Sequence, residues 1–315
     1  MHPAYSVIIF TTFSGAGFGL MAVLGFEAAF GEIARHWLIG LLGLGLAAAL
    51  AIAGLLSSTF HLGHPERAWR AFTQWRSSWL SREGVLAVAT FIPAAILGLT
   101  WIVTARPGVI ITLTGIVTAL LALATVYTTG MIYQSLPTIR AWHRTIVAPI
   151  YILLALMSGV VIAHALLLTL AQGDRAMGTA AIMLLVASAI AKLTYWHQID
   201  NAAPLATPGT ATGLGQFGTI RTLEHPHTMA NYVMREMGYS IGRKHAAKLR
   251  QIAVIAAFAL PALLIALSLT GNGLAALAAS WGAVITMMAG LFVERWLFFA
   301  EAEHVVMNYY GAKSA

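Results

Sequence analysis

The sequence has no cysteine and very little charge. Charged residues make up 9% of its 315 positions, whereas ordinary soluble domains contain about 25%. The chain therefore lacks the polar material to cover a water-facing surface. The absence of cysteine excludes disulfides, cysteine-bound iron–sulfur clusters and zinc–thiolate sites. A redox cofactor held by this chain alone would need histidine, methionine or carboxylate ligands.

What the sequence does contain is long apolar runs. Hydrophobic residues make up 59% of the chain, and its mean hydropathy is +0.80. A membrane-spanning helix needs about 20 mostly apolar residues, and continuous runs exclude the short alternating segments of a membrane β-barrel. The sequence predicts an all-α polytopic membrane protein, a single domain over 1–315. Its eight expected spans are 6–30, 37–60, 84–105, 109–133, 147–172, 177–198, 251–270 and 274–299.

Two connections between the spans are long, at 61–83 and 199–250. The second contains apolar residues at helical spacing from Met229 to Ile241, followed by the basic cluster from Arg243 to Arg250. This pattern predicts an amphipathic helix in the lipid headgroup region. A simple basic flank of the seventh span is an equally good interpretation.

The basic residues predict the orientation. With eight spans, the termini and the connections after spans two, four and six share one side of the membrane. That side holds thirteen Lys and Arg residues with Lys313 included, and the other side holds three, Arg35, Arg106 and Arg175. Cytoplasmic loops carry the excess of Lys and Arg, so we expect both termini and both long connections in the cytoplasm of a bacterium, with the spans in its inner membrane. The formal charge of +7 is then explained by the orientation of the chain in the membrane, and we expect no nucleic-acid binding.

The connection 61–83 is the densest functional candidate. It contains several Trp and Arg residues, which at a membrane boundary are ordinarily headgroup anchors; this is our interpretation of Trp69, Arg70, Trp75 and Arg76. His61 and Glu83 fit that interpretation less well, because neither is a typical anchor and both adjoin apolar spans. Ionisable groups in or next to a membrane are usually functional.

A quinone headgroup would use such residues. Its two carbonyl oxygens need donors such as an imidazole N–H or a guanidinium. Its oxidised and reduced forms differ by two protons, so a nearby carboxylate or imidazole must exchange protons with water. Its apolar tail needs lipid beside it. Composition alone leaves this hypothesis one among several.

The same segment resembles the signature of a known family. The stretch H-L-G-H-P-E-R-A at 61–68, followed by S-W-L-S-R-E at 78–83, is similar to the signature of the dimethyl sulfoxide reductase membrane-anchor family. The stretch Y-x-x-x-P-x-I-x-x-W at 133–142 fits it too. The resemblance implies an eight-span, haem-free subunit that holds an iron–sulfur electron-transfer subunit and a molybdopterin catalytic subunit against the membrane. It would exchange electrons with ubiquinone or menaquinone.

The resemblance also implies site residues and a branch of the family. The family's quinone site carries over to His61 and Glu83 as proton-exchanging residues, with companions His64, Arg67, Trp79 and Arg82. The N-terminal M-H-P-A-Y-S-V-I-I-F-T-T and the late N-Y-V-M-R-E-M-G-Y and R-K-H-A-x-K-L-R are similar to the anchors of cytoplasmic sulfite dehydrogenases. In that branch sulfite oxidation would send electrons to quinone. In a dimethyl sulfoxide reductase, menaquinol would supply them.

Ionisable residues elsewhere have less specific interpretations. We expect His164 and Glu27 to be buried hydrogen-bonded groups, although they would also suit the start of a proton path. Lys192 and Arg295 lie near helix ends and are predicted to snorkel to the interface. His225 and His227 form a metal-like pair with no third ligand nearby, and we interpret them as loop residues. Only His164 is central in a span, so two haem-ligating imidazoles at matching depth are not available and no haem or metal is expected.

The rival hypothesis from another class is a secondary transporter. Such proteins bind substrate near the bilayer midplane between broken helices. In this sequence the ionisable cluster lies at one edge of the spans, which favours the quinone-reactive anchor. Uncharged substrates would still be compatible with transport.

Overall fold

The computed structural model describes residues 2–31, 36–60, 62–104, 108–221, 223–224, 226, 229, 231–239 and 241–312. Among these residues, eight helices are long and apolar enough to span a membrane, which confirms the all-α polytopic prediction. Six of the spans are single helices: α1 (Tyr5–Phe30), α3 (Trp79–Thr104), α4 (Val109–Gln134), α5 (Val147–Thr169), α6 (Arg175–Asp200) and α12 (Gly273–Ala300).

The other two spans contain a π-helical turn. The second consists of η1 (Ile39–Gly43) and α2 (Leu44–Thr59). The seventh consists of α10 (Ala246–Val254), η4 (Ile255–Ala259) and α11 (Leu260–Thr270). In the seventh span the π turn lies just before Pro261, whose missing N–H removes one helical hydrogen bond. The local irregularity therefore has a sequence cause.

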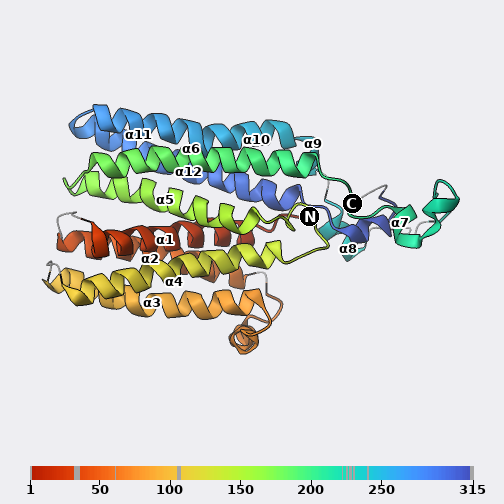
Figure 1. The fold of residues 1–315 in the computed structure, drawn as a ribbon, viewed down its shortest axis with the longest axis horizontal. Coiled ribbons are helices and arrows are strands. Elements are labelled where there is room, and N and C mark those ends of the chain that lie inside the picture. The colour runs from red at the N-terminus through yellow and green to blue at the C-terminus, as the bar shows by residue number, and fades with distance from the viewer. Residues whose placement is uncertain are drawn as a thin grey trace.

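The spans form two groups of four that pack side by side (Figure 1). In one group α1 packs on α2 and α4, and α3 packs on α4; in the other α5 packs on α6 and α12, and α11 packs on both of these. The groups meet where α1 contacts α5 and α12 and where α4 contacts α5. One continuous core of buried apolar side chains runs through both groups.

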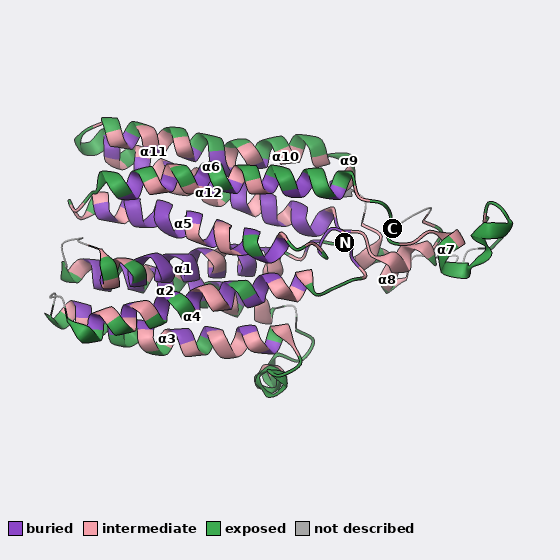
Figure 2. Cartoon of the chain, viewed as in Figure 1, coloured by how far each residue is buried: buried purple, intermediate pink, exposed green. Residues whose placement is uncertain are grey.

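Helices α1 and α5 are the interior of this bundle. In each, 78% of the most apolar stretch is buried, against 33–39% in the other six spans, and Figure 2 shows both as the most continuously buried ribbons. Their backbones approach closely at Gly19 and Gly159, where an added Cβ on either residue would overlap the backbone of the facing helix. Small residues permit such contacts between membrane helices. The junction of the two groups is therefore tightly packed.

Both termini lie at the same end of the bundle, which we call the termini face (Figure 1). The two long connections are on this face as well. The first contains η2 (Pro65–Gln74), a 3-10 helix. The second contains α7 (Pro208–Thr212), η3 (Leu214–Phe217), α8 (Tyr232–Met237) and α9 (Ile241–Lys244), and η5 (Val305–Asn308) follows α12.

The amphipathic helix expected between Met229 and Ile241 is only partly present. The structure has the short helix α8 there, capped by Asn231, whose side-chain oxygen accepts the Met234 N–H at 2.8 Å. The basic residues Lys248 and Arg250 instead belong to the first turns of the seventh span, which begins at Ala246. The interpretation as a basic flank of that span describes this segment better.

Candidate functional site

The first half of the signature segment folds into the exposed helix η2 at the termini face. The side chains of His64 and Arg67 are 68% and 56% exposed, and both reach Glu66, at 3.1 Å and 3.7 Å. The predicted site residue His61 lies outside the described residues. The structure therefore gathers His64 and Arg67 around Glu66 on the surface and does not bring them into the helix bundle.

The tryptophans of this segment are also exposed. Trp69 is 62% and Trp75 is 53% exposed. Arg70 and Arg76 each place the guanidinium near the ring of the preceding tryptophan, 5.7 Å and 5.5 Å from its centroid. Exposed Trp–Arg pairs beside a bundle of apolar helices agree with the interpretation of these four residues as headgroup anchors.

Arg82 holds the turn between η2 and α3. Its guanidinium donates to the backbone oxygens of Trp75 and Arg76, at 3.0 Å and 2.8 Å. It also stacks 4.2 Å from the ring centroid of Trp79, whose indole meets Tyr127 edge-on. Arg82 and Trp79 therefore fix the first turn of α3, and the contacts described here do not involve Glu83.

Among the described residues of the predicted site, Glu83 is the one that the structure buries. It lies in the second turn of α3 on a stripe of buried residues that continues through Ala87, Thr90 and Ala94. This spacing of three to four residues keeps one helix face against its neighbour, here α4. The side chain is 4% exposed. This buried stripe thus places a carboxyl group inside the membrane-spanning part of the bundle.

One threonine donates to this carboxyl group, and two more join the same helices deeper in the bundle. The Thr129 hydroxyl of α4 donates to Glu83 Oε1 and is also 3.1 Å from the Thr125 backbone oxygen. Thr90 and Thr125 join α3 to α4 deeper in the bundle, with their hydroxyl oxygens 3.2 Å apart. Burying a carboxyl group with so few donors is costly. Such a cost is usual where an ionisable group has a function.

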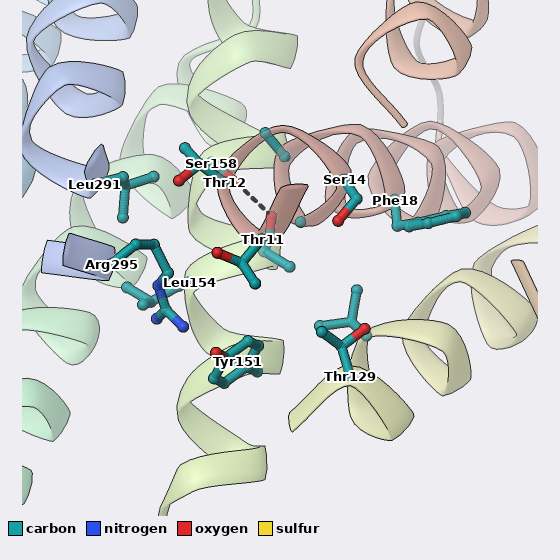
Figure 3. A pocket seen from close by; sticks show the side chains of 14 residues that line it. Thr11, Thr12, Ser14, Phe18, Thr129, Tyr151, Leu154, Ser158, Leu291 and Arg295 are labelled. Atoms are coloured by element: carbon teal, nitrogen blue, oxygen red, sulfur yellow. Dashed lines mark hydrogen bonds between the residues drawn. The ribbon is translucent and has the colours of Figure 1, made fainter. Parts of the chain in front are cut away.

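Thr129 also lines a polar pocket where the two groups of helices meet. The pocket has a cavity volume of about 20 Å³, which is room for about one water molecule, and α1, α4, α5 and α12 line it. Figure 3 shows Arg295 and Tyr151 projecting into it from one side and Thr11 from α1. Among the polar atoms of its wall, Thr12 Oγ1 is buried with no hydrogen-bond partner among the described residues. The Tyr151 hydroxyl and the Arg295 guanidinium are buried beside it and interact with each other. In a bundle of apolar helices this is a concentrated set of donors and acceptors.

Behind the pocket lies a buried cluster of three charges. Glu294 of α12 is fully buried and pairs with Lys192 Nζ of α6 and, at 2.6 Å, with Arg295 Nε. Lys192 is 1% and Arg295 4% exposed. The prediction that these two side chains snorkel to the interface is wrong. Each has an anionic partner inside the bundle, and each packs on aromatic rings: Lys192 lies 4.1 Å from the Tyr195 centroid and Arg295 4.2 Å from that of Tyr151.

Glu294 is the residue that reasoning from the sequence missed. It had a visible signal, because Glu294 and Arg295 are adjacent within a span, and charges buried in a membrane pair with one another. The sequence does not show that the partner of Glu294 comes from α6, about a hundred residues earlier. Only the packing of α6 near α12 reveals the cluster.

A second ionic cluster lies nearer the termini face. Arg250 binds Asp200 at 2.6 Å and Glu301 at 2.8 Å, and Arg243 approaches Glu303 at 3.2 Å. These residues and Arg140 line a polar pocket. Burial raises the pKa of the Glu301 carboxyl, although its hydrogen bond to Arg250 acts in the opposite direction. The cluster ties the ends of α6, α10 and α12 together.

The remaining candidates are His164, Glu27, His225 and His227. The prediction that His164 is a buried hydrogen-bonded group is confirmed, since its Nε2 lies 2.9 Å from the Ser268 hydroxyl and it is 1% exposed. The same prediction is wrong for Glu27, which is partly exposed near the end of α1. His225 and His227 lie outside the described residues. Within the part of the chain that is described, no group of three His, Asp or Glu side chains could hold a metal ion.

The 133–142 motif builds part of the core. Tyr133 and Trp142 are buried and meet edge-on with ring centroids 5.2 Å apart. The Trp142 indole N–H donates to the Phe298 backbone oxygen at 2.9 Å. The motif thus fixes the connection between α4 and α5 against the end of α12, close to the buried charges.

The fold and the buried polar groups define a class: a multi-pass helical membrane protein with an ionisable site near one face and no described metal-binding cluster. Comparison with known proteins identifies the family. The model of the DMSO reductase anchor subunit (DmsC) family matches residues 1–300, so the chain belongs to this family. It is similar to a sulfite dehydrogenase subunit from Allochromatium vinosum, with 31% identity over 98% of this chain and 99% of that protein. The chain is therefore a membrane anchor of a molybdoenzyme complex.

Proposed function

We propose that this anchor reacts with quinone and passes electrons from sulfite oxidation to the quinone pool. The observation that carries the proposal is Glu83, a carboxyl group buried close to the termini face with the Thr129 hydroxyl as its donor. The family supports a membrane anchor, and the similarity to a sulfite dehydrogenase subunit supports sulfite as the electron source. The sulfite would be oxidised in a molybdopterin catalytic subunit, and an iron–sulfur subunit would carry the electrons to this chain.

The reaction at this chain is the reduction of a quinone. Quinone takes two electrons from the iron–sulfur partner and two protons from water to become quinol. Glu83 exchanges protons with a quinone oxygen, and His61, which belongs to the same sequence motif, donates a hydrogen bond to a quinone carbonyl. Trp79 and Arg82, in the first turn of α3, form the entrance to this quinone site. The exposed His64 and Arg67 lie on the same surface segment, where they meet the quinone headgroup or the docked subunit.

The orientation supports the sulfite version over a reductase that faces the exterior. Outside the spans expected from the sequence, thirteen of the sixteen Lys and Arg residues fall on the side of the termini, which favours the assignment of that side to the cytoplasm. The catalytic and iron–sulfur subunits then dock in the cytoplasm, on the inner membrane. A dimethyl sulfoxide reductase, which takes electrons from menaquinol, is the alternative that the name of the family favours.

The decisive experiment compares two Glu→Gln variants in the whole complex. Glu83→Gln should lower quinone-coupled turnover by about 10²–10⁴-fold, the usual range for loss of a general acid or base. Sulfite oxidation with a soluble dye should persist, because it bypasses this chain. Glu224→Gln, at an exposed carboxylate outside the motif, is the matched control and should behave as the wild type. A Glu83→Gln complex that reduces quinone at the wild-type rate would refute the site.

A further inference from the structure

The polar pocket between the two groups of helices is enclosed by protein. Every residue in its lining except Gly15 is buried, and its cavity volume of about 20 Å³ is too small for a quinone ring but is room for about one water molecule. Its wall nevertheless contains the Thr12 hydroxyl, which has no hydrogen-bond partner in the described part of the chain, and the Tyr151 hydroxyl and Arg295 guanidinium, which interact with each other. Buried polar atoms are normally satisfied by protein or by ordered water. The pocket therefore suits water rather than a lipid-soluble ring.

Thr129 connects this pocket to Glu83. The residue lines the pocket, and its hydroxyl donates to the Glu83 carboxyl group. A threonine hydroxyl has one donor and two acceptor positions, so it can accept a proton from water in the pocket while it gives its own to the carboxylate. Tyr151, on the opposite wall, lies within electrostatic range of both Glu83 and Glu294.

The other end of the pocket leads toward the termini face. Arg295 joins the pocket to Glu294 and thereby to Lys192. Glu301 follows Glu294 by seven residues on the same side of α12, which is roughly 10 Å along the axis, and the buried Tyr195 lies within electrostatic range of both carboxyl groups. Glu301 and its partner Arg250 line the outer polar pocket with Asp200. Polar groups thus extend from the outer cluster to Glu83.

We propose that these groups form the proton route between solvent at the termini face and Glu83. The route runs from the Asp200–Arg250–Glu301 cluster through Glu294 and its two cations, then through the enclosed pocket to Thr129. It rests on the proposed function, because the protons delivered to Glu83 balance the two electrons that quinone receives from the iron–sulfur partner. Each quinone oxygen gains one proton, and each proton lost from Glu83 is replaced along the route.

The test uses conservative substitutions in the assembled complex. Thr129→Val removes the relay hydroxyl, and Thr129→Ser keeps it. Thr12→Val combined with Tyr151→Phe removes two hydroxyl groups of the pocket wall. Thr118→Val is the matched control, because Thr118 is also buried with an unpartnered hydroxyl in the same described ranges but does not line the pocket.

The measured quantities are kcat and KM for quinone, turnover with a soluble dye, and rescue by a small permeant weak acid such as acetic acid. Thr129→Val and the double variant should lower kcat at least tenfold with little change in KM and in dye turnover. Acetic acid should restore part of the rate. Thr129→Ser and Thr118→Val should resemble the wild type. Recovery by a weak acid is a response that a purely structural defect does not give.

The outcomes separate this inference from the proposed function. If Glu83→Gln abolishes quinone turnover while Thr129→Val and the double variant keep wild-type kcat, the route is refuted and the quinone site stands. If the double variant raises KM and leaves kcat unchanged, the pocket binds quinone and the route is refuted as well. If Glu83→Gln itself keeps full quinone turnover, both proposals fall.

Discussion

Replacing Glu294 by glutamine should destabilise the protein far more than the same replacement at Glu66. Glu294 is the anion of its buried cluster and neutralises both Lys192 and Arg295. Without it, two cations remain inside the bundle and lose the counter-charge that both of them contact. Glu66 also contacts two basic side chains, but its own side chain is 62% exposed, so water replaces the lost interaction.

The magnitudes follow from this difference in burial. Removing one partner of a buried ion pair costs about 3–5 kcal/mol, because an uncompensated charge is left behind. An exposed pair contributes about 0–1 kcal/mol. Lys192→Met should cost less than Glu294→Gln, since it leaves the neutral Glu294–Arg295 pair, 2.6 Å apart, intact. The expected order of damage is Glu294→Gln, then Lys192→Met, then Glu66→Gln.

The assay is thermal unfolding of the detergent-solubilised chain, followed by circular dichroism at one fixed scan rate. A loss of 3–5 kcal/mol should lower the apparent Tm by at least roughly 6 °C, whereas Glu66→Gln should change it by no more than a degree or two. Equal midpoints for Glu294→Gln and Glu66→Gln would show that Glu294 does not hold two buried cations, and the reasoning from burial would fail.

Two further predictions concern orientation and pH. Reporter fusions after residues 80, 140 and 230 should report the cytoplasm, and fusions near residues 33, 107 and 174 should report the exterior. The reason is that most basic residues lie on the first set of connections. The reverse pattern would remove the support for a cytoplasmic sulfite dehydrogenase. Burial lowers the pKa of His304 below 6.5, and its neutral Nδ1 accepts the Val306 N–H at 3.0 Å. The stabilisation by neutral His304 is present above pH 6.5 and is lost as the pH falls through the lowered folded-state pKa. Hydrogen exchange at the Val306 amide, corrected for its intrinsic pH dependence, should therefore accelerate on acidification. His304→Gln should remove that response.

The spans could be predicted from the sequence because a bilayer imposes a minimum length on an apolar helix. All eight expected spans are found, and most boundaries agree within two or three residues. The main exceptions are the starts of α3 and the seventh span, which begin five residues before the expected 84 and 251. In both, charged residues occupy the first turns: Arg82 and Glu83 in α3, and Lys248 and Arg250 in α10. Hydropathy assigns such turns to loops, although the helix continues through them.

The candidate site could be predicted only in part, for a related reason. The motif contains His64, Arg67 and Glu83 within twenty residues of one another, and this proximity in sequence predicts a single cluster. In the structure the end of η2 separates them: His64 and Arg67 remain in solvent, while the stripe on α3 takes Glu83 into the bundle. Whether a charged residue near a helix end is buried depends on which face it occupies and on what packs there.

The same reasoning explains why Lys192 and Arg295 were assigned to the interface. Each is a single cation about one or two turns from a helix end, and such a residue in isolation would extend toward the headgroups. Here α6 packs near α12, and Glu294 gives both cations a buried partner. A buried cluster with two cations and one anion has a net positive charge, which favours negative charge nearby. Arg295 lines the same pocket as Thr129, the donor to Glu83, so the cluster that the sequence concealed lies close to the proposed quinone site.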